Sequence, residues 1–324
     1  MKYFITGATG FIGGCLARQL REAGHEVIAV VRSPEKAKDL SEIGVVLHKG
    51  DVADKESMRK PMTGVDGVFH VAGWYKFGVR DKSQAYATNV GGTRNVLELM
   101  KELNIRKGVY TSTLAVNSDT QGVEVDESYH FTGKHISVYN QTKSDAHDIA
   151  VKMIKEGLPL VIVQPGLVYG PGDTSSVHIS LIQYLKEQLP VIPQKTAFSW
   201  AHVDDIAHAH QLAMENGKVG ENYNICGPTH TLVNSFEIAK EITGVRMPMV
   251  VPAGMIRVMS SIMYLFDKFI HVPESYTGEG LRIIAGVTYI GKNSKAKREL
   301  GYNPRPLKEG LTETLRHEMK LLGM

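Results

Sequence analysis

A glycine-rich turn near the start of the chain restricts its fold more than any other feature. Residues 2–6 predict a short buried strand, which leads directly into Gly7-Ala8-Thr9-Gly10-Phe11-Ile12-Gly13. A helix is expected over Cys15–Ala23, with Gly24 ending it, and a second apolar strand over Val27–Val31. Such glycines let a turn tighten, let backbone approach a pyrophosphate and let the helix pack closely on the strand. The alternative is a glycine-rich turn without a ligand.

The same alternation of strand and helix continues along the first half of the chain. Further strands are expected at Val45–His48, Gly67–Val71, Lys107–Thr111 and Leu160–Gln164, and helices at Lys55–Met62, Gln84–Leu103 and Tyr139–Glu156. Repeated units of this kind predict an α/β fold, a Rossmann-type doubly wound parallel sheet. We expect residues 1–172 to form this dinucleotide-binding domain. Residues 173–324 should mainly form a smaller C-terminal α/β substrate lobe, with return crossings to the sheet.

The second half is less regular. Helices are expected at His178–Leu189, within Trp200–Met214, at Asn234–Thr243 and at Leu307–Leu322, and a strand at Asn222–Ile225. The segment Pro252–Pro273 carries an apolar stripe at helical spacing: Met255, Met259, Met263, Leu265, Phe266 and Phe269. One interpretation is a core or dimer contact. The other is a methionine-rich wall over an apolar substrate, because thioethers adapt to irregular ligands.

Composition narrows the class of protein. The 324 residues are 43% hydrophobic and 22% charged, as in ordinary globular proteins, and the net charge of +3 includes no basic run that would indicate nucleic acid. Cys15 and Cys226 form no disulfide framework, which suits the reducing cytoplasm. The first strand leaves no room for a signal peptide, and the apolar run Val258–Phe266 is too short to cross a bilayer. We therefore expect a cytoplasmic protein with no membrane partner.

The end of the second strand selects the cofactor. Val31 is followed by Arg32, Ser33, Pro34, Glu35 and Lys36. A guanidinium fork is suited to a ribose 2′-phosphate, with Lys36 as a second cation, which favours NADP(H) over NAD. The alternative is a solvated Arg32, with Glu35 or a more distant acid binding the ribose.

Three later strand ends supply further candidates. Asp51 is positioned to accept from the adenine amino group and Val52 to pack on its ring; the alternative is that Asp51 only caps the next turn. Val71, Ala72 and Gly73 are small enough to let backbone approach a cofactor. The preceding His70 is expected to be a packed core residue.

A Tyr and a Lys one helical turn apart are the strongest catalytic signal. Tyr139 and Lys143 share one helix face, and an ammonium close to a phenol lowers the pKa of the phenol. Such a phenol exchanges a proton with a substrate oxygen near neutral pH. The hydroxyl cluster Thr111-Ser112-Thr113 follows a predicted strand.

Together these motifs resemble the extended short-chain dehydrogenases/reductases, and most closely their dihydroflavonol reductase-like branch. The resemblance rests on motifs in the family's order: residues 6–13, His70-Val71-Ala72-Gly73, Tyr139-x-x-x-Lys143, residues 165–173 and His202-Val203-Asp204-Asp205. It implies an NADP(H)-dependent oxidoreductase in which Tyr139 is the general acid or base. Lys143 would tune that phenol and hold the nicotinamide ribose, and Thr113 would orient the substrate carbonyl, a role that Ser112 could share.

The resemblance also implies the remaining cofactor contacts. They would come from the glycine turn, the triplet and the segment after the sixth strand: Gly7, Thr9, Gly10, Phe11, Ile12, Gly13, Thr111, Pro165 and Val168. It further implies a homodimer through the helices at 84–103 and 139–156. Their apolar stripes are Val90, Val96, Leu97 and Met100, and Ala146, Ile149, Ala150 and Met153. The alternative is that these stripes only face the sheet.

One departure from the family bears on the substrate. Sugar-nucleotide epimerases and dehydratases of the superfamily commonly carry an Arg shortly before the His-Val-x-Asp motif, where this chain has Lys195 and then Phe198 and Trp200. An apolar small-molecule substrate is therefore expected, with a nucleotide-sugar epimerase or dehydratase as the alternative. We expect no metal, because His208 and His210 do not share a helix face. Asp204 and Asp205 are expected to cap or brace the junction with the lobe.

Overall fold

The computed structural model describes residues 1–78, 81–267 and 272–324. Seven parallel strands form a central sheet in the order β10-β6-β5-β4-β1-β2-β3. They are β1 (Lys2–Thr6), β2 (Glu26–Val31), β3 (Val46–Lys49), β4 (Gly67–His70), β5 (Gly108–Thr111), β6 (Leu160–Pro165) and β10 (Asn222–Ile225). The predicted doubly wound α/β sheet is confirmed. Its strand order reverses beside β1, where open sheets bind ligands beyond the carboxyl ends of the strands.

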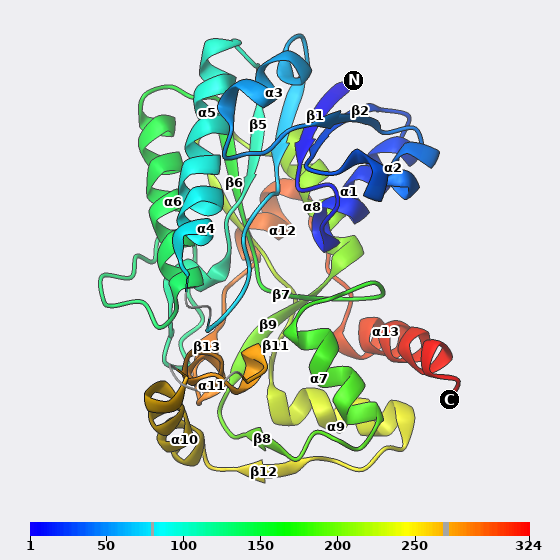
Figure 1. Cartoon of the computed structure of the whole chain (residues 1–324), viewed down its shortest axis with the longest axis vertical. Coiled ribbons are helices and arrows are strands. Elements are labelled where there is room, and N and C mark those ends of the chain that lie inside the picture. The colour runs from blue at the N-terminus through cyan, green and yellow to red at the C-terminus, as the bar shows by residue number, and fades with distance from the viewer. Residues whose placement is uncertain (79–80, 268–271) are drawn as a thin grey trace.

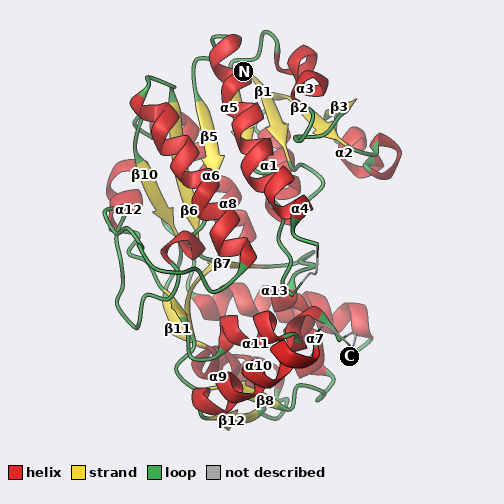
Figure 2. Ribbon diagram, turned by 60° about the vertical axis from the view of Figure 1, so that its left-hand side comes forward, coloured by secondary structure: helices red, strands yellow, loops and turns green. Residues whose placement is uncertain are grey.

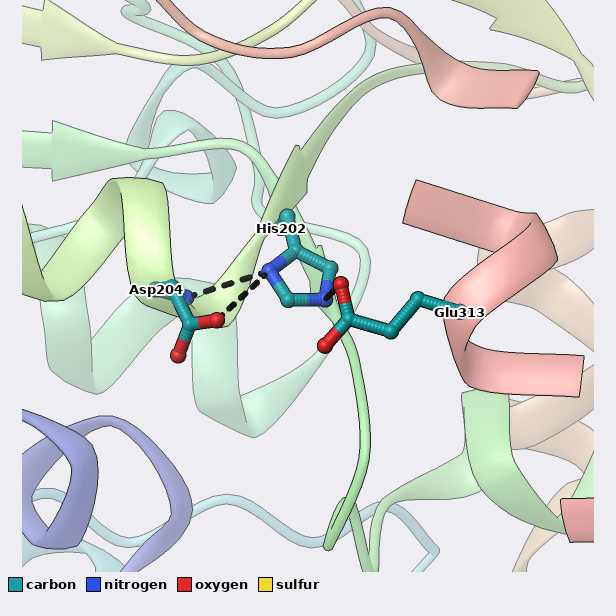
Figure 3. A group of neighbouring side chains, drawn as sticks. All are labelled: His202, Asp204 and Glu313. Carbon is teal, nitrogen blue, oxygen red and sulfur yellow. Dashed lines mark hydrogen bonds and ion pairs between the residues drawn. The ribbon is translucent and has the colours of Figure 1, made fainter. Parts of the chain in front are cut away.

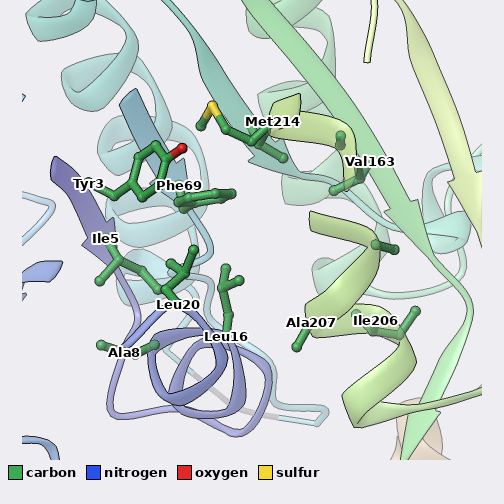
Figure 4. Close-up of a cluster of buried hydrophobic side chains, with 14 of the residues drawn as sticks. Tyr3, Ile5, Ala8, Leu16, Leu20, Phe69, Val163, Ile206, Ala207 and Met214 are labelled. Carbon is green, nitrogen blue, oxygen red and sulfur yellow. The ribbon is translucent and has the colours of Figure 1, made fainter. Parts of the chain in front are cut away.

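Helices cover both faces of the sheet (Figure 1). One face packs against α3 (Lys55–Met62), α5 (Thr93–Glu102) and α6 (Val138–Lys155). The other packs against α1 (Phe11–Glu22), α2 (Lys38–Glu42), α8 (Val203–Asn216) and α12 (Ser294–Leu300). Figure 4 shows Ile5 and Phe69 of the sheet near Leu16 of α1; Ile206 of α8 belongs to the same buried cluster. Central strands buried on both faces explain the continuous apolar runs in the sequence.

The lower lobe is built from the second half of the chain (Figure 2). Its helices are α7 (Ser176–Leu185), α9 (Leu232–Thr243), α10 (Ala253–Phe266), α11 (Gly278–Ile284) and α13 (Leu307–Leu322). Its short strands are β7 (Leu167–Tyr169), β8 (Val191–Pro193), β9 (Ala197–His202), β11 (Thr229–Thr231), β12 (Met249–Val251) and β13 (Thr288–Tyr289). Between these elements the chain returns to the sheet as α8, β10 and α12.

Two predicted helices differ from the structure near the site. The first helix begins at Phe11 rather than Cys15, and Gly24 follows it with φ of 79°. The helix expected over residues 84–103 is interrupted. A short α4 (Ser83–Ala85) leads into a π-helix over Tyr86–Gly92 before α5 begins. Such π-helical turns have no distinctive hydrophobic period, so the pattern alone predicts one continuous helix.

The apolar stripes proposed for dimerisation largely face inward. Val96, Leu97 and Met100 of α5 are buried against the sheet, as are Ala146 and Ala150 of α6. As dimer contacts these five predictions are wrong, because the sheet already covers the side chains. The other members of the stripes, Val90, Ile149 and Met153, are partly buried.

The stripe on α10 divides in a different way. Met263 packs with Val251, Ile256 and Leu281, so the core interpretation is correct for that residue. For Met255 and Met259 it is wrong, because both side chains are exposed. Phe269 lies outside the described residues.

Candidate active site

The predicted site residues gather along one edge of the sheet. Gly7 follows β1, Arg32 follows β2, Asp51 follows β3, Val71 follows β4 and Thr111 ends β5. The strands are parallel neighbours, so these carboxyl ends lie side by side. Pro165 and Val168, at the end of β6 and in β7, continue the same edge.

The turn after β1 has the geometry of an anion cradle. Gly7 has φ of 77°, and a Cβ there would lie 2.6 Å from the backbone nitrogen of Ala72. A Cβ on Gly13 would lie 2.1 Å from the carbonyl oxygen of Gly7, so both positions require glycine. No side chain caps α1 at Gly10, and its first turn carries no acid. The amides of that turn therefore suit a pyrophosphate.

Cations stand at the end of β2. Arg32 and Lys36 are exposed, and neither forms an ion pair with another residue in the described ranges. Glu35 is also exposed on the same turn. The Arg32 guanidinium and the Lys36 ammonium are therefore free to contact a phosphate.

At the end of β3, the Asp51 Oδ1 accepts from the backbone N–H of Ala53 at 2.9 Å, which is the turn-capping role considered for it.

Lys143 is held by the strand beside it. Its buried Nζ donates to the Thr111 carbonyl at 2.7 Å and to the Tyr110 hydroxyl at 3.3 Å. Burial lowers the pKa of Lys143 to about 7. The carbonyl of Thr111 thus positions the ammonium on the face of α6 that also carries Tyr139, one turn earlier.

The phenol of Tyr139 differs electrostatically from the sequence-based expectation. Burial raises the pKa of Tyr139, Tyr75 adds to the rise, and a hydrogen bond with Thr113 offsets part of it. The expected lowering by Lys143 is wrong here, because removal from water dominates. The phenol accordingly keeps its proton at neutral pH, as a proton donor requires.

The hydroxyls of the 111–113 triplet face different neighbours. Thr111 Oγ1 bonds to His210 Nε2 at 2.8 Å, and Ser112 Oγ bonds to His147 Nδ1 at 2.9 Å. Of the three hydroxyls in the triplet, only that of Thr113 forms a hydrogen bond with Tyr139. Because Ser112 is committed to His147, the structure favours Thr113 for the hydroxyl role.

Aromatic side chains from the loop after β4 surround the phenol, and sequence reasoning missed them. The ring centroid of Tyr75 lies 4.8 Å from that of Tyr139, and that of Phe77 lies 6.0 Å away, both edge-on. Asn89 in the π-helix fixes this loop: its Oδ1 accepts from the Trp74 N–H at 2.7 Å, and its Nδ2 donates to the Trp74 carbonyl at 3.1 Å. The signal available in the sequence was that these aromatic residues, Tyr75 and Phe77, closely follow the small residues after β4.

Glu279 of α11 is a second residue that the sequence did not reveal. Its buried carboxylate accepts from the Gly78 N–H and from the Val138 N–H, each at 2.6 Å. The first belongs to the aromatic loop and the second opens α6, one residue before Tyr139. One carboxylate of the lobe therefore fixes both segments that flank the phenol. No local pattern marks it, because its partners are 201 and 141 residues away.

Two of the histidines, His70 and His210, are held in buried hydrogen bonds. His70 lies between the hydroxyls of Thr6 (2.8 Å) and Thr93 (3.0 Å), and burial lowers its pKa to about 3, which agrees with the predicted core position. His208 is exposed and His210 is buried against Thr111, so they do not meet.

His202, Asp204 and Glu313 do come together at the junction with the lobe (Figure 3). The Nδ1 of His202 accepts from the Asp204 backbone N–H at 3.3 Å, and its Nε2 lies 3.8 Å from the Glu313 carboxylate. Arg305 pairs with Glu313 at 2.9 Å and with Asp205 at 2.9 Å. The Arg305 guanidinium neutralises the carboxylates of Asp205 and Glu313. These ion pairs, together with His202, brace α8, β9 and α13 against one another.

None of the helices in the described part of the chain combines the length and apolar character needed to cross a bilayer.

A small polar pocket lies between α6 and the segment after β5, lined in part by Asp126, His130, His147 and Gln164. It contains none of the predicted site residues.

Comparison with known proteins agrees with this geometry. Residues 3–226 match the NAD dependent epimerase/dehydratase family. The chain is 30% identical to the "Putative dihydroflavonol 4-reductase" of Synechocystis, over 97% of this chain and 93% of that protein. It is 27% identical to the 4-hydroxy-2-methyl-3-oxo-4-farnesyl-3,4-dihydroquinoline-1-oxide ketoreductase of Stigmatella aurantiaca, over 94% and 92% of the two chains.

Two solved structures have the same fold over nearly their whole length. The crystal structure of gox2253 superposes with a TM-score of 0.86 at 29% identity, covering 99% of this chain and 98% of that one. The UDP-glucose 4-epimerase of Thermotoga maritima superposes with a TM-score of 0.79 at 25% identity, covering 99% and 100%.

Proposed function

The chain belongs to the NAD dependent epimerase/dehydratase family of extended short-chain dehydrogenases/reductases, and we propose that it is an NADP(H)-dependent carbonyl reductase of an apolar small molecule. The observation that carries the proposal is the half-buried Tyr139, which meets Thr113 and shares a helix face with Lys143, at the edge of the sheet where the glycine turn lies. Relatives named as reductases over almost the full chain support the reaction class.

NADP(H) fits the side chains at the edge of the sheet. The uncapped start of α1 suits the pyrophosphate, and Arg32 and Lys36 suit the 2′-phosphate. When bound, the cofactor supplies or accepts the hydride. The unpaired cations after β2 favour the phosphorylated form of the cofactor over NAD.

The residues of this chain handle the proton. Thr113 and Tyr139 donate hydrogen bonds to the carbonyl oxygen of the substrate, and the phenol then transfers its proton to that oxygen as the alcohol forms. Burial outweighs Lys143 in setting the pKa of the intact phenol, but once the proton has left, the Lys143 ammonium, fixed by the Thr111 carbonyl one helical turn away, is the cation that stabilises the phenolate. In the oxidative direction the phenolate accepts the proton. Tyr75 and Phe77 provide an apolar wall beside the reacting group.

The experiment is a turnover screen of aromatic and alicyclic ketones with NADPH and with NADH. The proposal predicts turnover that falls by at least about tenfold when NADH replaces NADPH, since a charge-assisted bidentate contact contributes about 1.5–3 kcal/mol. Equal rates with both cofactors would contradict the cofactor assignment, and no turnover of any ketone would contradict the reductase assignment.

The alternative is a nucleotide-sugar epimerase, which the likeness to the Thermotoga enzyme favours. Lys195 is the available cation before His202, and it is exposed. Trp200 is buried, and its Nε1 donates to the His230 carbonyl, so this segment supplies core rather than a diphosphate clamp. Interconversion of UDP-glucose and UDP-galactose without added NADPH would establish the alternative.

A further inference from the structure

The outer face of α10 is the largest group of exposed apolar side chains on one described helix. Six side chains recur at helical spacing on this face, and each is exposed: Met255, Val258, Met259, Ile262, Leu265 and Phe266. β12, which runs directly into the helix, adds Met249 and Val250. Soluble proteins rarely leave such a continuous apolar surface uncovered unless it binds a partner or a membrane.

The helix is firmly attached to the lobe on its opposite side. Ile256 and Met263 pack against α11, and Ser260 donates to the Gly278 carbonyl at 2.8 Å. The apolar residues therefore point outward from a helix that is already folded and anchored. Figure 1 places α10 at the lower edge of the molecule, at the end remote from the N-terminus.

The charges around this face fit an anionic surface. Residues 244–266 contain no Asp or Glu and two Arg, Arg246 and Arg257. Both are exposed, and neither forms an ion pair with another described residue; the Arg257 Nε donates to the Ala285 carbonyl at 3.0 Å, which leaves the rest of its guanidinium to contact a phosphate. The next acid, Asp267, directs its Oδ2 to the Gly278 N–H at 2.7 Å, toward α11.

We propose that α10 docks the protein on the surface of an anionic phospholipid membrane, with its apolar face in the interface and the two arginines at the lipid phosphates. An amphipathic helix with basic flanks binds membranes in this way without crossing them. A second copy of the chain is a poorer occupant, because two-fold pairing of this face would bring cations together without a carboxylate to neutralise them. The sequence-based expectation of no membrane partner rested on spanning length, which a helix lying on the surface does not need. The inference is independent of the proposed reductase activity.

The test is co-sedimentation of the full chain with vesicles of phosphatidylcholine, with or without about 30% phosphatidylglycerol. The parent should bind the anionic vesicles more tightly, and high salt should weaken that binding. Val258→Asp should lower the partition coefficient at least about tenfold, because it places a charge in the apolar face.

Val219→Asp is the matched control. Val258 and Val219 are 61% and 53% exposed, but Val219 precedes β10 in the sheet domain. The control should bind vesicles as the parent does. Both variants should keep the parent melting temperature, since neither side chain is in the core.

Three results would overturn the proposal: no binding of the parent to anionic vesicles, equal losses in the two valine variants, or a parent dimer in light scattering that Val258→Asp converts to a monomer. The last result would identify a second copy of the chain as the occupant.

Discussion

Glu279→Gln should separate the positioning of Tyr139 from the binding of the cofactor. The parent carboxylate accepts two backbone N–H groups at 2.6 Å, from Gly78 and Val138, in a buried setting. An amide keeps one acceptor oxygen and turns an NH2 group toward the other N–H. The loss of one charge-assisted bond beside a helix N-terminus should cost about 2–3 kcal/mol of folding stability.

The catalytic effect follows from the two segments that the carboxylate joins. If the aromatic loop or the start of α6 shifts, the phenol is misplaced. Small misplacements of a catalytic group lower reaction rates by about ten- to a hundredfold. The assay measures kcat with a ketone substrate, the dissociation constant of NADPH by calorimetry and the melting temperature. We expect kcat to fall while NADPH affinity is unchanged, because the glycine turn lies away from Glu279.

Glu318→Gln is the matched control. Glu318 is a buried carboxylate of the same lobe, on α13 rather than on α11, and lies 3.4 Å from His178. It should lower the melting temperature and leave kcat unchanged. A Glu279→Gln variant with lower melting temperature and normal kcat would refute the positioning role and leave Glu279 as a stability residue only.

Three further predictions concern other parts of the molecule. Arg32→Ala should weaken NADPH binding by about ten- to a hundredfold and leave NADH nearly unchanged; equal losses for both cofactors in calorimetry would exclude the 2′-phosphate contact. Burial lowers the pKa of Lys143 to about 7 in the folded chain, whereas the unfolded chain keeps that proton to about pH 10.4. The free energy of unfolding should therefore rise with pH between these values. From about pH 7.5 to about pH 9 it should rise by about 2 kcal/mol more in the parent than in Lys143→Met, and denaturant titrations that give both proteins the same pH dependence would contradict the pKa. We also propose a homodimer through the outer faces of α5 and α6, which light scattering at micromolar concentration should report as twice the chain mass; a monomer would refute it.

The regular half of the fold was predictable because its signals are local. Strands such as Lys2–Thr6 and Asn222–Ile225, and helices such as Lys55–Met62 and Leu307–Leu322, have the predicted bounds. Parallel strands buried on both faces leave continuous apolar runs, and the turns between them use glycine. The lobe strands of two to six residues, among them Thr288–Tyr289, leave no periodic signal and were missed.

Motif residues of the site were identifiable, but their surroundings were not. Tyr139, Lys143 and Thr113 follow from spacing, whereas the pKa of Tyr139 depends on burial that no spacing reports. Asn89 acts through a π-helical turn, and Glu279 acts across a separation of 141 residues. Both depend on tertiary contacts that composition does not record.

The proton-donor role of Tyr139 is tested most directly by Tyr139→Phe. The variant keeps the ring that packs on Tyr75 and removes the hydroxyl that meets Thr113. NADPH should bind with parental affinity in calorimetry, and turnover of a ketone that the parent reduces should fall by at least about a hundredfold. Near-normal turnover, with NADPH still bound, would contradict the assignment of Tyr139 as the acid.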